Sequence, residues 1–82
     1  MKSQLFNILF AKKIKQSREE KQLLQRQLAA ALEIDTPMYS KIERGDRKAK
    51  REQVVKLAEL LRVDSEELLI LWLADQITTL VS

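Results

Sequence analysis

The sequence contains no cysteine and no histidine, and these absences exclude several classes of protein. Without cysteine there is no disulfide framework and no thiolate metal site. Zinc sites draw mostly on cysteine and histidine, so a structural zinc is close to excluded. The most common general base is also missing. A chain of 82 residues supports one modest core with little room for a buried active site. We therefore expect one domain that is not an enzyme and has no metal and no cofactor.

Long apolar runs are missing as well. Beyond the start, the longest run extends from Leu68 to Ala74, far short of the ~20 residues that span a bilayer. The apolar start LFNILF is interrupted by Asn7 and followed by Lys12 and Lys13. An export signal needs an unbroken apolar stretch of about 7–15 residues and a small-residue cleavage site. We therefore expect a cytoplasmic protein.

Negative charge is scarce in the first part of the chain and dominates the last part. Residues 1–58 contain 14 Lys and Arg against 7 Asp and Glu, whereas residues 59–82 contain 1 against 5. The balances of +7 and −4 add to the net charge of +3. A basic body followed by an acidic, apolar end indicates two surfaces with two kinds of partner.

The residues that are abundant predict an all-α protein. Leu, Lys, Glu, Gln and Ala favour helix, and no stretch of useful length alternates as a strand would. We expect a compact bundle of five helices. Their expected ranges are about 3–21, 25–32, 36–44, 51–61 and 65–79.

The single proline and the single glycine lie eight residues apart, in the stretch ALEIDTPMYSKIERG. Asp35 is a good N-cap because its side-chain oxygen can accept a backbone N–H of the first turn. Pro37 falls in that first turn, where the missing N–H costs no hydrogen bond. Gly45 falls just past the last turn, where a left-handed residue suits a helix end. These three residues predict one short, sharply bounded helix.

One face of this short helix is apolar and the other carries small polar groups, a flat ring and two cations. The spacing turns Met38, Tyr39 and Ile42 inward. A major groove suits the outward face, because short side chains allow close approach and a few donors can read base edges. An ordinary amphipathic surface helix is the alternative. The candidate base-reading residues are Thr36, Pro37, Ser40 and Lys41.

The flanking segments favour the interpretation as a nucleic-acid reader. The preceding stretch LLQRQLAAALEI predicts another short helix, and two short helices on a tight turn form a helix-turn-helix. The following stretch RGDRKAKR, residues 44–51, carries five positive charges against one negative. It is either a solvated loop or a segment along a phosphate backbone, where each neutralised phosphate releases counterions.

At this point a family resemblance is clear. The stretch from about Phe10 to Leu69 resembles the Xre family of helix-turn-helix regulators, the Cro-like and phage-repressor-like DNA-binding domains. The resemblance implies a lambda-repressor-like bundle that binds DNA as a dimer, with the third helix in the major groove. The matching residues are Ile14, Arg18, Gln25, Leu28, Ala29, Ile34, Ile42, Glu43, Arg44, Gly45, Leu57, Ala58, Leu61, Val63 and Leu68.

The resemblance also implies roles for single residues. Thr36, Pro37 and Lys41 match positions that face base edges. Arg18 and Glu43 match a structural pair that joins the first helix to the third. The residues implied to contact phosphate are Gln25, Arg44, Arg47, Lys48, Lys50 and Arg51.

The sequence departs from the family pattern at three helix boundaries. Leu24 replaces the usual Ser or Thr cap of the second helix. Glu33 replaces the usual Gly in the turn, so this turn must accommodate a side chain. Ala49 and Lys50 replace the usual Pro-Ser pair before the fourth helix.

Both ends of the chain extend beyond the common core of about residues 10–69. The last helix is apolar nearly all round, and such a helix must be covered on more than one side. We expect a two-fold interface that leads to an inverted-repeat DNA site; the alternative is that the two extensions cover only each other. The expected interface residues are Leu71, Trp72 and Ile77, with Leu5 and Phe6 alongside.

Three functions remain compatible with this pattern. The first is a homodimeric transcription regulator, with repression as the expected role. The second is an antitoxin that binds a toxin protein and represses its own operon. The third is a compact controller of restriction–modification genes. No feature of the sequence supports an enzyme.

Overall fold

A computed structural model describes the backbone of residues 8–81 and the side chains of residues 8–74. It contains five helices, and no strand occurs in this described part. The predicted all-α class and the predicted bounds of the third and fourth helices are confirmed. The first and second helices end one residue earlier than expected and the fifth ends two residues later. The helices are α1 (Ile8–Glu20), α2 (Gln25–Ala31), α3 (Thr36–Arg44), α4 (Arg51–Leu61) and α5 (Ser65–Val81).

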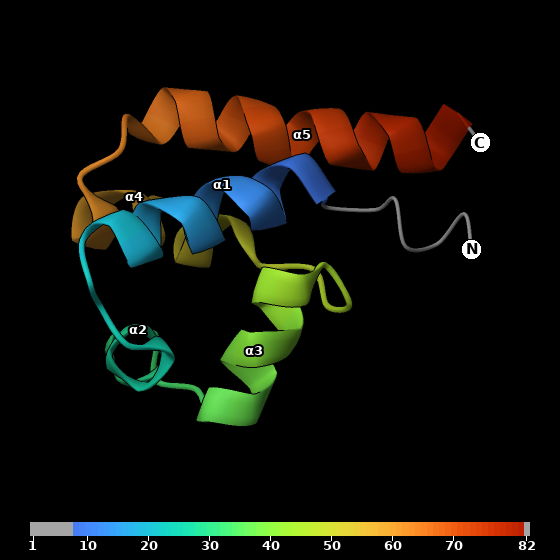
Figure 1. Ribbon diagram of the computed structural model, residues 1–82. Coiled ribbons are helices and arrows are strands. Elements are labelled where there is room, and N and C mark those ends of the chain that lie inside the picture. Colours follow the sequence, from blue (N-terminus) through green and yellow to red (C-terminus); the bar gives the residue numbers. More distant parts are fainter. Residues whose placement is uncertain (1–7, 82) are drawn as a thin grey trace.

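The helices lie in two groups at opposite ends of the molecule (Figure 1). Helix α5 lies along one edge with α1 packed beside it, and α2 and α3 lie at the opposite end. Helix α4 packs against α5 and α1. None of the helices in the described part has the length and apolar character needed to cross a membrane. Within the part of the chain that the structure describes, one side of α3 and one side of α5 have no neighbouring helix.

Every helix contributes to a single core. The spacing of apolar residues on each helix gathers these side chains on its inner face. Burial of a large apolar side chain stabilises the fold by about 1.5–3 kcal/mol, so the core holds the two ends of the molecule in a fixed relation. The largest fully buried side chains are Phe10, Ile14, Leu28, Tyr39, Ile42, Val54, Leu57, Leu61 and Leu68.

The ends of α3 are fixed by the three residues that the sequence singled out. The Met38 amide donates to Asp35 Oδ1 at 2.8 Å, which caps the N-terminus. Pro37 lies in the first turn. Gly45 ends the helix with φ of 82°, in the left-handed region where a residue without Cβ is favoured. The predicted bounds of α3 are confirmed because each boundary depends on residues within one helical turn.

Glutamine side chains accommodate the departures from the family pattern at two helix starts, and a left-handed residue accommodates the one in the turn. Gln27 Oε1 accepts the Leu24 amide at 2.7 Å, so a residue of the first turn stabilises the start of α2 in place of a Ser or Thr cap. Gln53 Oε1 accepts the Lys50 amide at 2.8 Å in the same way at α4. Glu33 adopts φ of 61° in the turn between α2 and α3. A side chain in this conformation costs about 1–2 kcal/mol, which the fold tolerates.

Candidate nucleic-acid interface

Helix α3 presents the predicted base-reading residues on one outward face. Thr36, Pro37 and Lys41 are exposed, and Ser40 is half-buried. Tyr39 and Ile42 are buried on the opposite side of the helix. The helix is therefore anchored through its apolar side, and its outward side carries the short side chains of Thr36, Pro37 and Ser40 beside the longer Lys41. Such a surface can approach the edges of bases in a major groove.

A buried ion pair holds α3 to α1. Arg18 Nε donates to Glu43 Oε2 at 2.8 Å, and Arg18 Nη2 donates to Glu43 Oε1 at 3.0 Å. Arg18 Nη1 also donates to the Leu23 carbonyl at 2.9 Å. This two-pronged geometry is the strong form of a carboxylate–guanidinium contact. The structural pair implied by the resemblance is present, and it fixes the C-terminal end of α3 relative to α1.

The same carboxylate also orients Gln25 at the start of α2. Gln25 Nε2 donates to Glu43 Oε1 at 3.0 Å, and the side chain is half-buried. Sequence reasoning assigned Gln25 to a phosphate and did not foresee this contact. A primary amide carries two hydrogens and a carbonyl oxygen, so the contact to Glu43 orients the group while leaving it capacity to donate to a phosphate.

The protonation states in this cluster follow from burial and hydrogen bonding. Burial by itself would raise the pKa of Glu43, but hydrogen bonds from Arg18 and Gln25 hold that pKa below its ordinary value. Burial, with the Glu43 carboxylate nearby, raises the pKa of Tyr39 far above its ordinary range. Glu43 is therefore a carboxylate and Tyr39 a neutral phenol at neutral pH, so the cluster joins α1, α2 and α3 without a titrating group near pH 7.

The predicted phosphate cations lie at the end of α3, in the loop that follows it, and at the start of α4. The Asp46 and Arg47 amides both donate to the Lys41 carbonyl, at 2.8 and 3.2 Å, so the loop turns back against α3. Arg44 Nε donates to Asp46 Oδ2 at 3.0 Å in an exposed pair. The cations of this segment that are exposed to solvent are Arg44, Arg47, Lys48, Lys50 and Arg51.

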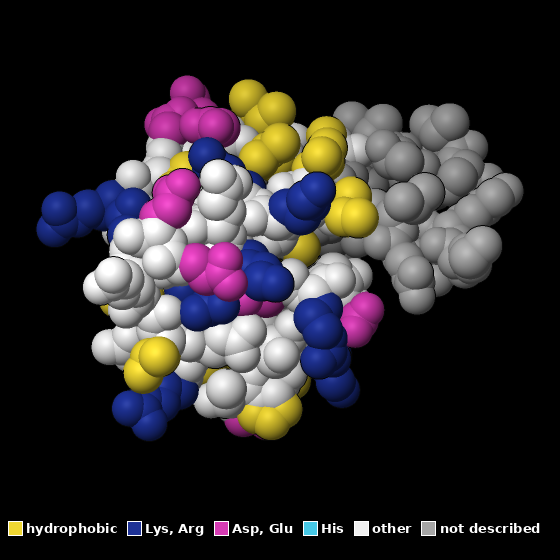
Figure 2. Space-filling model, viewed as in Figure 1, with side chains coloured by type: hydrophobic (Ala, Val, Ile, Leu, Met, Phe, Trp, Pro, Cys, Tyr) yellow, Lys and Arg dark blue, Asp and Glu magenta, His cyan; other side chains and the backbone are white. Residues whose placement is uncertain are grey.

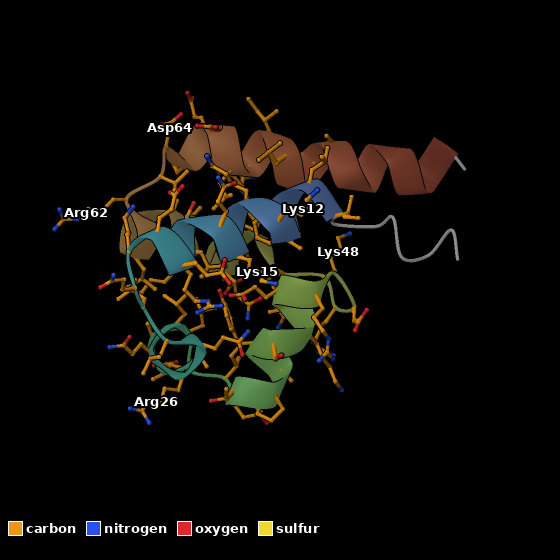
Figure 3. The ribbon with its side chains drawn as sticks, in the orientation of Figure 1. Lys12, Lys15, Arg26, Lys48, Arg62 and Asp64 are labelled. Carbon is orange, nitrogen blue, oxygen red and sulfur yellow. The ribbon has the colours of Figure 1, made fainter. Side chains whose placement is uncertain are left out.

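The structure adds two cations that sequence reasoning missed. Figure 3 shows Lys12 and Lys15 of α1 on the same side of the molecule as Lys48 of the loop. Both lysines are exposed. Their spacing of three residues places them on one face of a helix, and this spacing was the signal available in the sequence. The positive surface around the loop therefore extends onto α1.

Two of the residues expected in a two-fold interface also contact the core of their own domain. Leu71 and Trp72, which were assigned to an interface, are half-buried and pack against the core. Each therefore contacts the core with part of its surface and leaves part accessible, and the interface role expected for both residues stays a prediction. The side chains of Leu5, Phe6 and Ile77 lie outside the described residues.

Further apolar side chains of α1 and α5 are exposed. Figure 2 shows hydrophobic side chains gathered over the side of the molecule that α1 and α5 form. Among the side chains that the structure describes, the exposed large hydrophobic residues of these two helices define an α1–α5 apolar surface. They are Ile8, Leu9, Ile70 and Leu73.

Comparison with known proteins agrees with the geometry. The helix-turn-helix family model matches residues 14–68, which span α1 from its second turn, the pair α2–α3, α4 and the first turn of α5. No curated protein and no solved structure matches the chain. The matched segment is more than half of the chain and includes both the buried core and the outward face of α3. The chain therefore belongs to the Xre/Cro-like helix-turn-helix family of DNA-binding transcription regulators.

Proposed function

We propose that this protein binds double-stranded DNA in a sequence-specific manner as a homodimer and represses transcription. One observation carries the proposal of base reading. Helix α3 is held to the core by Tyr39 and Ile42, while Thr36, Pro37 and Lys41 on its other side are exposed. A helix that is anchored on one side and carries mostly short side chains with a few polar groups on the other fits a major groove.

The outward residues of α3 differ in what they can read. Lys41 can donate to the acceptors of guanine, and the hydroxyls of Thr36 and Ser40 can donate or accept. Pro37 has no donor, so its contribution is apolar contact with a thymine methyl or a fixed approach to the groove. Lys41 is therefore the residue whose loss changes sequence preference most.

Replacing Lys41 by alanine is expected to relax the preference at one base pair in each half-site. A bidentate contact to guanine contributes about 1–3 kcal/mol of discrimination against the wrong base. The preferred site is first obtained by selection from random duplexes with the purified protein, and single-base variants are then compared by titration. Lys56→Ala, which removes an exposed lysine of α4, is the control and leaves the preference unchanged. If the affinity for every DNA sequence fell by the same factor, Lys41 would contact a phosphate and not a base.

The α1–α5 apolar surface supports the proposal of a dimer. It lies on the opposite end of the molecule from α2 (Figure 1), and large exposed apolar patches mark interaction sites. A second copy is the proposed occupant because one small domain reads too few base pairs to find one site in a genome. A two-fold dimer presents its two α3 helices in opposite senses. The DNA site is then an inverted repeat, with half-sites about 34 Å apart.

Replacing Leu73 by glutamate is expected to convert a dimer into a monomer, because two copies of the buried charge would meet in the interface. Leu24→Glu is the matched control, since Leu24 and Leu73 are each 49% exposed and Leu24 lies before α2. Sedimentation at micromolar concentration measures the change. A wild-type protein that stays monomeric both alone and on its selected DNA overturns the dimer. The surface would then suit a protein partner, as in an antitoxin.

A further inference from the structure

The only tryptophan of the chain connects α5 to the basic loop. Trp72 is half-buried against the core, and its indole Nε1 donates to the Ala49 carbonyl at 2.8 Å. The two residues are 23 positions apart in the sequence. An indole N–H is a donor only and usually finds an acceptor when it is buried. Here the acceptor is the backbone of the segment that carries the phosphate cations.

Ala49 is the point at which this loop is fastened. Its side chain is buried, whereas Lys48 and Lys50 on either side of it are exposed. The Arg47 amide is held by the Lys41 carbonyl, and the Lys50 amide is held by Gln53 Oε1. The indole bond lies between these two anchors. It fixes the peptide between Ala49 and Lys50, in the backbone that runs from one exposed lysine to the next.

No proline stiffens this loop, since the only proline of the chain is Pro37. Proline restricts the backbone by fixing φ. A loop without it loses more conformational entropy when it is ordered on a ligand. A hydrogen bond from a packed helix to the middle of the loop can supply the same restriction from outside. Trp72 is placed to do this because α5 is itself held by Leu68 in the core.

We propose that Trp72 is a positioning residue for DNA binding, which holds the loop so that Lys48 and Lys50 face the phosphate backbone. This inference rests on the proposed function, because it takes these lysines as phosphate contacts. Trp72 itself does not touch DNA. Its loss weakens binding to all sequences alike and leaves base preference to α3.

The first experiment uses no DNA and examines the loop alone. Trp72→Phe keeps an aromatic ring against the core but removes the donor. Amide hydrogen exchange by NMR is then followed at Asp46, Arg47 and Lys50, whose amides have acceptors in the structure. In Trp72→Phe we expect these three amides to exchange faster than in the wild type, relative to amides in the middle of α4. Leu69→Ala, which trims another half-buried residue of α5, is the control and speeds exchange of the whole domain without singling out the loop.

The second experiment measures DNA affinity. Trp72→Phe is expected to lower the affinity for the selected duplex and for unrelated duplexes by the same factor, about 3- to 10-fold for each bound protomer, the worth of one net hydrogen bond. Replacement of the indole by the isosteric benzothiophene side chain, which has sulfur in place of N–H, repeats the test with the packing preserved. Full affinity in that variant, or unchanged loop exchange, overturns the proposal.

The two experiments separate this inference from the proposed function. If the wild-type protein selects no DNA sequence and binds duplexes without salt dependence, the proposed function fails, whatever the loop does. If the wild type binds DNA and the loop amides respond to the indole donor while affinity stays unchanged, DNA binding stands and the positioning role is wrong. The single indole N–H resonance gives an independent readout, since DNA contact at Lys48 and Lys50 should shift it.

Discussion

Replacing Glu43 by alanine is expected to lower the free energy of unfolding by about 3–5 kcal/mol, because a buried charge is left without its partner. The Arg18 and Glu43 side chains are only 13% and 2% exposed. The substitution also removes the acceptor of Gln25. The hydrogen bonds that α1 and α2 donate to Glu43 of α3 are therefore lost. Urea unfolding followed by circular dichroism measures the loss. For a domain of this size, such a loss is a large fraction of the total stability.

The chain contains a matched control for this experiment. Arg44 and Asp46 form a pair through a single hydrogen bond, with Nε and Oδ2 3.0 Å apart, and their side chains are 59% and 53% exposed. Exposed pairs contribute about 0–1 kcal/mol, so Asp46→Ala should change stability little. If Glu43→Ala does not fold, Glu43→Gln keeps the volume and an acceptor and still removes the charge. Equal small losses for the buried and the exposed pair would contradict the assigned role.

The same pair predicts how stability depends on pH. The pKa of Glu43 is lower in the folded protein than in the unfolded chain, since Arg18 and Gln25 stabilise its charged form despite burial. The stabilisation is therefore fully present above the ordinary glutamate pKa of about 4.3. It is lost as pH falls below that value and through the folded pKa. Unfolding measured between about pH 6 and pH 3 should show this loss in the wild type and a smaller one in Glu43→Gln.

Replacing both Arg47 and Lys48 by glutamine is expected to reduce the salt dependence of DNA binding strongly. Each phosphate contact contributes a slope of about 0.9 in a plot of log affinity against log salt. Two cations in each protomer make four contacts per dimer, so the slope should fall by about 3–4 units. Dilution from 200 to 50 mM salt raises the affinity of both proteins. The increase should be smaller in the double variant than in the wild type by a factor of roughly 100. The preferred sequence should stay the same.

Arg62 provides the control for this change. It is exposed at the end of α4, and Figure 3 shows it on the side of the molecule away from Lys48. Arg62→Gln removes one positive charge without touching the loop, so it tests whether net charge alone accounts for the effect. A slope that is unchanged in the double variant would show that the basic run is a solvated loop. A change in the preferred DNA sequence would show that Arg47 or Lys48 contacts a base and not a phosphate.

The best-determined parts of the protein from sequence alone are those that depend on near neighbours. Asp35, Pro37 and Gly45 fixed both ends of α3 because capping and φ preferences act within one helical turn. The outward face of α3 followed from the helical period once those ends were set. The family resemblance added the pair of Arg18 with Glu43, which no local pattern would have joined across 25 residues.

Only the tertiary structure decided which distant groups meet. It placed the Gln25 amide on Glu43, 18 residues away, and the Trp72 indole on the backbone of Ala49. It also buried Leu71 partly and left Leu73 exposed on the same helix. Helical period places residues around an axis, but burial depends on where neighbouring helices lie. On a helix that is apolar nearly all round, hydrophobicity cannot distinguish the covered side from the open one, and the packing of α5 on α1 and α4 makes that choice.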